Sequence, residues 1–105
     1  MMERSEKLIQ QDVISTLRRM GHYVMRLNSG KYKMFNEAGK GRYIMGQESG
    51  TPDVMSIHQG KVYFWEVKRP GKKPTPIQEA RMKVLEQYGA KCCTVTNMDD
   101  VINNL

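Results

Sequence analysis

The stretch from Gly50 to Gln78, GTPDVMSIHQGKVYFWEVKRPGKKPTPIQ, decides the fold. Residues 54–57 and 62–67 are rich in β-branched and aromatic side chains, and the segment HQGK at 58–61 separates them. Gly60 supplies the positive φ that a short hairpin turn needs. The pattern predicts an antiparallel hairpin, followed by a basic loop and the start of a helix.

The turn also sets which residues face each other across the hairpin. If Gln59 and Gly60 are the two loop residues, Asp53 lies opposite Glu66 with a Cβ separation of roughly 5 Å. Lys68 projects from the same face, because side chains alternate along a strand. Two carboxylates that close repel each other unless one is protonated or a divalent cation bridges them. The face therefore offers two oxygen ligands and a cation, which suits metal-assisted attack on a phosphodiester; an odd-length loop or a bulge would break this register.

The order Asp53-x12-Glu66-x-Lys68 resembles the signature of PD-(D/E)xK nucleases. The flanks GTPD at 50–53, EVKRPG at 66–71 and TPIQ beginning at Thr75 resemble the virus-type replication-repair nuclease (VRR-Nuc) family. The triplet alone occurs often by chance, whereas the triplet with these flanks is much more specific. The resemblance covers most of the chain from residue 6 onward.

The resemblance implies a single α/β domain over residues 1–105 with a restriction-endonuclease-like fold. Its mixed sheet would be flanked by helices in the order α-β-(β-β)-β-β-α-β. It also implies Mg²⁺ or Mn²⁺ bound by Asp53, Glu66 and the backbone carbonyl of Val67. Lys68 would position the attacking water or stabilise charge in the transition state.

Two further residues are catalytic candidates by resemblance. Glu6 matches a glutamate that the first helix of these nucleases often places near the metal, and Gln10 is a second candidate one turn on. Glu6 can equally favour the helix dipole. Gln78 would orient water or phosphate, but it also completes a capping box with Thr75, and both roles hold only if the cap does not consume its side chain.

Helices and further strands are predicted around the hairpin. Residues 5–20 form a helix with an apolar stripe of Leu8, Ile9, Val13, Leu17 and Met20. A second helix begins at Pro76, with a stripe of Ile77, Val84, Leu85 and Tyr88. Strands are expected at 23–27, 32–35, 42–45 and 92–96, and a turn and short helix at 97–105. Both faces of the hairpin are largely apolar, so we expect the sheet to be covered on both sides, with Phe64 and Trp65 in the core.

Composition points to a polyanionic partner. The 105 residues carry 17 basic and 11 acidic side chains, a net charge of +6, which suits nucleic acid or simply a soluble surface rich in lysine. A flap with basic residues among tyrosines, and a loop after the catalytic strand, supply the expected DNA contacts: Lys31, Lys33, Lys40, Arg42, Arg69, Lys72 and Lys73. The alternatives are an ordinary exposed hairpin and a solvated linker.

Other classes of protein are disfavoured. No apolar run approaches the roughly 20 residues of a membrane span, and no signal peptide opens the chain. Cys92 and Cys93 are adjacent, so they are expected to be reduced and at least half-buried in a cytoplasmic protein, in the host cell if the source is viral. No organic cofactor and no membrane partner are expected.

The residues and the resemblance together predict a metal-dependent, structure-specific DNA endonuclease. The short stand-alone form resembles dimeric members of the family that cut symmetric branched DNA such as four-way (Holliday) junctions, and it hints at a phage source. A non-catalytic nucleic-acid-binding module on the same fold, a nuclease for flap or duplex DNA, and an RNA-directed or sequence-specific restriction-type nuclease remain open alternatives.

Overall fold

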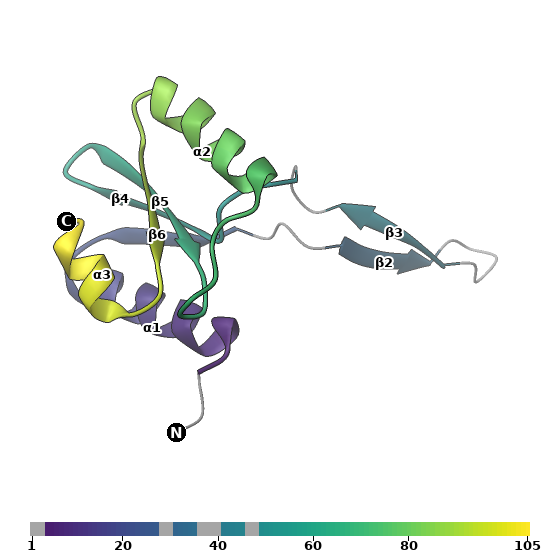
Figure 1. The fold of residues 1–105 in the computed structure, drawn as a ribbon, viewed down its shortest axis with the longest axis horizontal. Helices are drawn as coiled ribbons and strands as arrows, with labels where there is room; N and C mark the ends of the chain where they lie inside the picture. The colour runs from purple at the N-terminus through teal and green to yellow at the C-terminus, as the bar shows by residue number, and fades with distance from the viewer. Residues whose placement is uncertain (1–3, 28–30, 36–40, 46–48) are drawn as a thin grey trace.

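The structure is a computed structural model that describes residues 4–27, 31–35, 41–45 and 49–105. For residues 31–35 and 41–45 it describes the backbone alone. Its elements are α1 (Glu6–Arg19), β1 (Tyr23–Arg26), β2 (Lys31–Phe35), β3 (Gly41–Met45), β4 (Val54–His58), β5 (Lys61–Val67), α2 (Pro76–Gln87), β6 (Lys91–Val95) and α3 (Met98–Asn103). Four strands form a mixed sheet in the order β1-β4-β5-β6, whereas β2 and β3 pair only with each other. Figure 1 shows α2 on one side of this sheet, α1 and α3 on the other, and the β2–β3 ribbon projecting away.

The β4–β5 hairpin has the predicted register. Val54 pairs with Trp65, and the pairing runs without a bulge to His58 opposite Lys61. The two loop residues both have positive φ, 51° at Gln59 and 80° at Gly60. Two positive φ values are what a type I′ turn requires, and this turn matches the twist of the flanking strands.

Helix α1 begins and ends as its sequence predicts, but its buried stripe is narrower. The Ser5 side chain accepts a hydrogen bond from the Leu8 N–H at 3.2 Å, which caps the first turn. The buried residues are Ile9, Val13 and Leu17, spaced four apart. The predicted burial of Leu8 and Met20 is wrong: they are 46% and 43% exposed. Leu8 lies about 100° around the helix from the buried row, and Met20 caps its C-terminal end.

The main core lies between the sheet and the α1–α3 layer. It includes Val54 and Trp65 from the hairpin, packed with Val13 and Leu17 of α1. Trp65 is fully buried, as predicted, and its indole N–H donates to the Ser56 hydroxyl at 2.9 Å. Ser56 also lies 3.0 Å from Nδ1 of His22. On this face of the hairpin the buried polar groups of Trp65 and His22 thus both have the Ser56 hydroxyl as their partner.

The α2 side of the sheet is covered only in part, which corrects the expectation of a sheet covered on both sides. Helix α2 packs on β6, with Met82 as its buried residue and Leu85 half-buried. On the uncovered half, Tyr23 of β1 is 61% exposed and Ile57 of β4 is 37% exposed.

The predicted apolar stripe of α2 is also wrong for three of its four members. Ile77, Val84 and Tyr88 are 60%, 43% and 88% exposed. The inward row instead follows Gln78, Met82 and Leu85, which are buried or half-buried and share one helix face at i, i+4 and i+7. Because this row starts with a polar residue, apolar periodicity does not reveal it.

The last strand returns beside β5 in parallel, and α2 forms the crossover between them. Val67 pairs with Val95, and the Lys68 N–H donates to the Val95 carbonyl at 3.0 Å. Cys92 is half-buried and Cys93 buried, and both are free thiols, as expected. None of the helices within residues 4–27 and 49–105 is long and apolar enough to cross a bilayer.

Candidate active site

The hairpin brings Asp53 and Glu66 together at its open end. Asp53 directly precedes β4 and Glu66 lies near the end of β5, so the observed register places them opposite each other. They lie close enough for the charge of Asp53 to raise the pKa of Glu66. The Val67 N–H donates to Oδ2 of Asp53 at 2.8 Å, which fixes the orientation of that carboxylate. The predicted juxtaposition of the two carboxylates is confirmed.

Glu66 is buried and Asp53 half-buried, and one oxygen of Glu66 lacks a donor. Glu66 is 1% exposed, and its Oε2 has no hydrogen-bond partner. Burial, and after it the charge of Asp53, raise the pKa of Glu66 to about 8. Burial also raises the pKa of Asp53, against the opposing effect of the Val67 N–H. Two carboxyl groups this close favour a state in which one of them holds a proton when no cation is present.

Lys68 completes the predicted trio. Its Nζ lies 3.9 Å from Oε1 of Glu66, and its side chain is 13% exposed. The ammonium group lowers the pKa of both carboxyls, but burial outweighs it at each of them. Lys68 therefore lies beside the pair, and a small part of its side chain remains open to solvent.

Glu6 lies near this site, whereas the contacts of Gln78 are those of the cap that opens α2. Glu6 is exposed in the first turn of α1, and its negative charge makes a small contribution to raising the pKa of Asp53 and Glu66. Gln78 accepts a hydrogen bond from the Thr75 N–H at 2.9 Å while its own N–H donates to Oγ1 of Thr75 at 3.2 Å. The capping box thus occupies the Gln78 carbonyl oxygen. Gln10, the second helix candidate, is half-buried one turn beyond Glu6.

The donor set fits a hard divalent cation. Carboxylate oxygens are the ligands that Mg²⁺ and Mn²⁺ prefer, and a buried Oε2 without a donor is a position that a cation can satisfy. The described residues contain no group of three or more His, Cys, Asp or Glu side chains able to hold a metal. Two carboxylates remain, which suits Mg²⁺, an ion that usually keeps several waters. The Val67 peptide lies against Asp53 through its N–H, and its carbonyl remains a predicted ligand.

The loop before Asp53 is held against the start of α2 by Gly50. This residue has φ of 84°, and a Cβ at this position would lie 2.7 Å from both Cγ2 and the carbonyl oxygen of Ile77. Pro52 beside it is buried. The Arg81 guanidinium also donates to the Ser49 carbonyl at 3.5 Å. Gly50 thus has a structural role that the sequence motif signals but does not explain: it allows α2 to approach the strand that carries Asp53.

The predicted DNA contacts are placed only in part. Arg69, Lys72 and Lys73 are exposed in the loop that leaves the site after Lys68, where a turn donates from the Lys72 N–H to the Arg69 carbonyl at 3.0 Å. Of the flap residues, Lys31 and Lys33 lie in β2 and Arg42 lies in β3, whereas Lys40 lies outside the described residues. The two short strands predicted there are confirmed.

One solved structure resembles this chain over nearly its whole length. That structure, a "VRR_NUC domain", aligns with a TM-score of 0.66 at 22% sequence identity, and the match covers 93% of this chain and 90% of that chain. The likeness establishes a shared fold, in agreement with the predicted mixed sheet flanked by helices. No protein-family model and no curated protein match the sequence.

Proposed function

We propose that this protein is a metal-dependent, structure-specific DNA endonuclease that hydrolyses phosphodiester bonds in branched DNA. The observation that carries the proposal is the closeness of half-buried Asp53 to buried Glu66, with the Lys68 ammonium beside them. A binding module gains nothing from two carboxyl groups held this close together and largely away from water, whereas a phosphodiesterase uses them to hold a cation.

The roles of the residues follow from their surroundings. Asp53, Glu66 and the carbonyl of Val67 would hold Mg²⁺ or Mn²⁺, which when bound lowers the pKa of a water and polarises the scissile phosphate. The Val67 N–H keeps one Asp53 oxygen in place and so orients the other. Burial of Glu66 excludes competing water from its side of the site. The Lys68 ammonium positions the attacking water or stabilises charge on the phosphate.

Glu6 and Gln78 have supporting roles in this proposal. Glu6 lies close enough for its charge to act on both carboxyls, so it can bind a metal-bound water. Gln78 has its amide nitrogen left to donate, because the cap uses its carbonyl oxygen. Either residue would orient water without holding the metal directly.

DNA would be bound through its phosphates. Arg69, Lys72 and Lys73 are exposed directly after Lys68, so a backbone they contact passes the carboxylates. The predicted flap residues Lys31, Lys33, Lys40 and Arg42 would bind a second segment of the backbone. Contacts of this kind recognise the shape of DNA rather than its sequence, which favours branched substrates. Two copies related by a two-fold axis would match the symmetry of a four-way junction.

Cleavage of a labelled four-way junction in Mn²⁺ tests this proposal. Lys68→Ala should lower the cleavage rate by at least about 100-fold, as expected when a donor to transition-state charge is removed. Lys83→Ala, which removes an exposed lysine of α2, is the matched control and should leave the rate unchanged. Equal cleavage by the Lys68→Ala variant and the unmodified protein would exclude the role of Lys68.

A panel of duplex, flap, junction and RNA substrates separates the proposed preference from its rivals. Thermal stabilisation by Mn²⁺ gives a readout independent of activity, and it should be lost in Asp53→Asn. Junction binding that persists with chelator, without cleavage in any divalent ion, would instead favour a non-catalytic binding module.

A further inference from the structure

An apolar area is left open on the α2 side of the sheet. Tyr23 and Met25 of β1 are 61% and 42% exposed, and they pair with Ile57 and Met55 of β4. Paired residues of neighbouring strands project from the same face, so the four side chains form one continuous strip. Helix α2 packs on β6, two strands away from β4 in the sheet, and so does not cover this strip.

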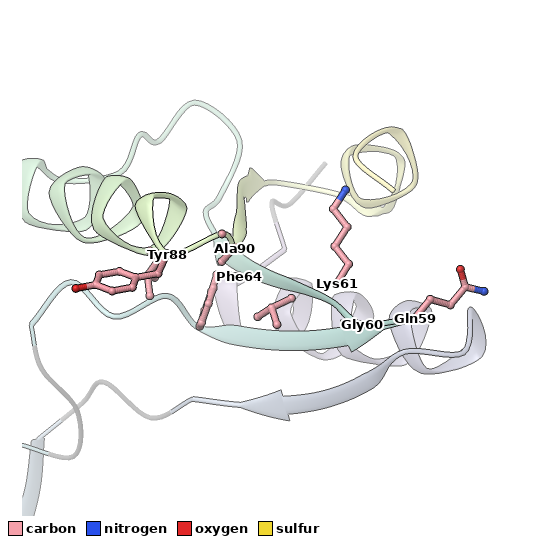
Figure 2. A pocket seen from close by; sticks show the side chains of 9 residues that line it. Gln59, Gly60, Lys61, Phe64, Tyr88 and Ala90 are labelled. Atoms are coloured by element: carbon pink, nitrogen blue, oxygen red, sulfur yellow. The ribbon is translucent and has the colours of Figure 1, made fainter.

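The strip adjoins a hollow with a protruding tyrosine at its rim. The hollow has a volume of about 530 Å³, and Val62, Phe64 and Leu85 are its apolar lining. Tyr88 follows the last turn of α2 and is 88% exposed. Figure 2 shows Tyr88 beside Phe64 at one end of the hollow and the turn at Gln59 and Gly60 at the other. Val62 pairs with Ile57, so hollow and strip belong to one surface.

The chemistry of this surface indicates its occupant. Although the chain carries a net charge of +6, the strip and the apolar lining of the hollow contain no basic side chain. Lys61 is the basic residue at the rim of the hollow. A polyanion would find few partners here, and a protein surface of the same apolar character fits better.

The shape of the surface favours a second copy of this chain. An isologous two-fold interface is self-complementary, so a projection on the surface must meet a recess of the same surface in the other copy. Here Tyr88 is the projection and the hollow beside it is the recess. An aromatic side chain covers roughly 150–250 Å², and Tyr88 exposes most of its own. Together with Tyr23, Met25 and Ile57 this gives several hundred Å² of apolar surface, a substantial part of the roughly 800 Å² that each partner contributes to a stable interface.

We propose that this surface is the dimer interface of the protein, with Tyr88 of each copy inserted into the hollow of the other. The inference rests on the proposed function only because that function expects two copies of the chain. The inference names the surface that joins them. The hollow runs from the turn at Gln59 and Gly60 as far as Phe64, which lies two residues before Glu66 on β5.

The oligomeric state of three variants, measured by light scattering and sedimentation equilibrium without DNA, tests this interface. Tyr88→Glu and Tyr23→Glu each place a charge on the surface from a different element, and both positions are exposed enough for the monomer to fold. Ile102→Glu is the matched control, because Ile102 is 50% exposed on α3 behind the opposite face of the sheet. Circular dichroism verifies folding.

We expect the unmodified protein and Ile102→Glu to have twice the mass of one chain. The dimer dissociation constant should rise at least about 30-fold in Tyr88→Glu, the loss expected for a central aromatic anchor. A monomeric unmodified protein, or Tyr88→Glu and Tyr23→Glu dimers of unchanged affinity, would overturn the interface. Retained dimers that lose junction binding would show that DNA occupies this surface and would also overturn it.

Failure of the interface and failure of the nuclease proposal give different results. A monomeric unmodified protein that still cleaves DNA in a Lys68-dependent manner would refute the interface alone. A dimer broken by Tyr88→Glu but inactive in every divalent ion would support the interface and refute the nuclease.

Discussion

Replacing Glu66 by Gln should make the metal-free protein more stable at neutral and alkaline pH. Glu66 is almost completely buried, and its Oε2 lacks a partner. Gln has nearly the same shape, carries no charge, and can donate its amide to the Asp53 carboxylate. The substitution therefore removes the cost of ionising a buried acid and offers Asp53 a hydrogen-bond donor in its place.

The pH dependence follows from the direction of the shift. The pKa of Glu66 rises from 4.5 to about 8 on folding. Below about pH 4.5 the carboxyl is protonated in both folded and unfolded chains, so its contribution to stability is fully present. As the pH rises from about 5 to about 8, unfolding releases this proton, and the free energy of unfolding falls by up to about 1.4 kcal/mol per pH unit.

Summed over the window, the loss is at most about 5 kcal/mol. Asp53 shares the shift with Glu66, so we expect a difference of about 2 to 5 kcal/mol between Glu66→Gln and the unmodified protein near pH 8. That is a large share of the 5–15 kcal/mol typical of a domain, and it corresponds to roughly ten degrees or more in Tm.

Urea unfolding in the presence of chelator, at a series of pH values, measures this difference. The two proteins should be similar near about pH 5 and diverge as the pH increases. Glu79→Gln, which changes an exposed carboxylate of α2, is the control and should show no such divergence. Mn²⁺ should raise the Tm of the unmodified protein near pH 8 and have little effect on Glu66→Gln. A stability difference that is the same at every pH would refute the reasoning, because Glu66 would then be ionised throughout.

Two further predictions concern the scaffold. Gly50→Ala should lower the free energy of unfolding by about 2 kcal/mol or more, because it adds a contact at 2.7 Å to the strain of φ 84°. The control Gly71→Ala has the same φ but no atom near its Cβ, so it should cost only about 1–2 kcal/mol; equal losses would contradict the close approach. Ser56→Ala should cost about 1–3 kcal/mol in urea unfolding, because Trp65 and His22 lose their common partner, and unchanged stability would mean that water replaces the hydroxyl.

The relative placement of the three candidate site residues could be predicted from sequence, because turns and strand alternation set it locally. One two-residue turn aligns Asp53 with Glu66, and alternation along a strand adds Lys68 to the same face. The capping box that opens α2 was likewise predictable from four consecutive residues.

The orientation of α2 could not be predicted in the same way. Its inward row starts with Gln78, and Ile77 is exposed although Gly50 packs closely against it. Apolar periodicity indicates which side of a helix could be buried, whereas the available neighbours decide which side is. Helix α2 covers β6 and leaves this face of β1 and β4 open to solvent, and the sequence does not reveal this arrangement.

The sequence by itself determined the elements, their caps and the register that pairs the two carboxylates, because turns and alternation act over a few residues. The tertiary structure alone decided that Glu66 is buried with an unpaired oxygen, that α2 turns Tyr88 outward, and that half of one sheet face lies open. Burial depends on which distant segments come together, and no local pattern records that.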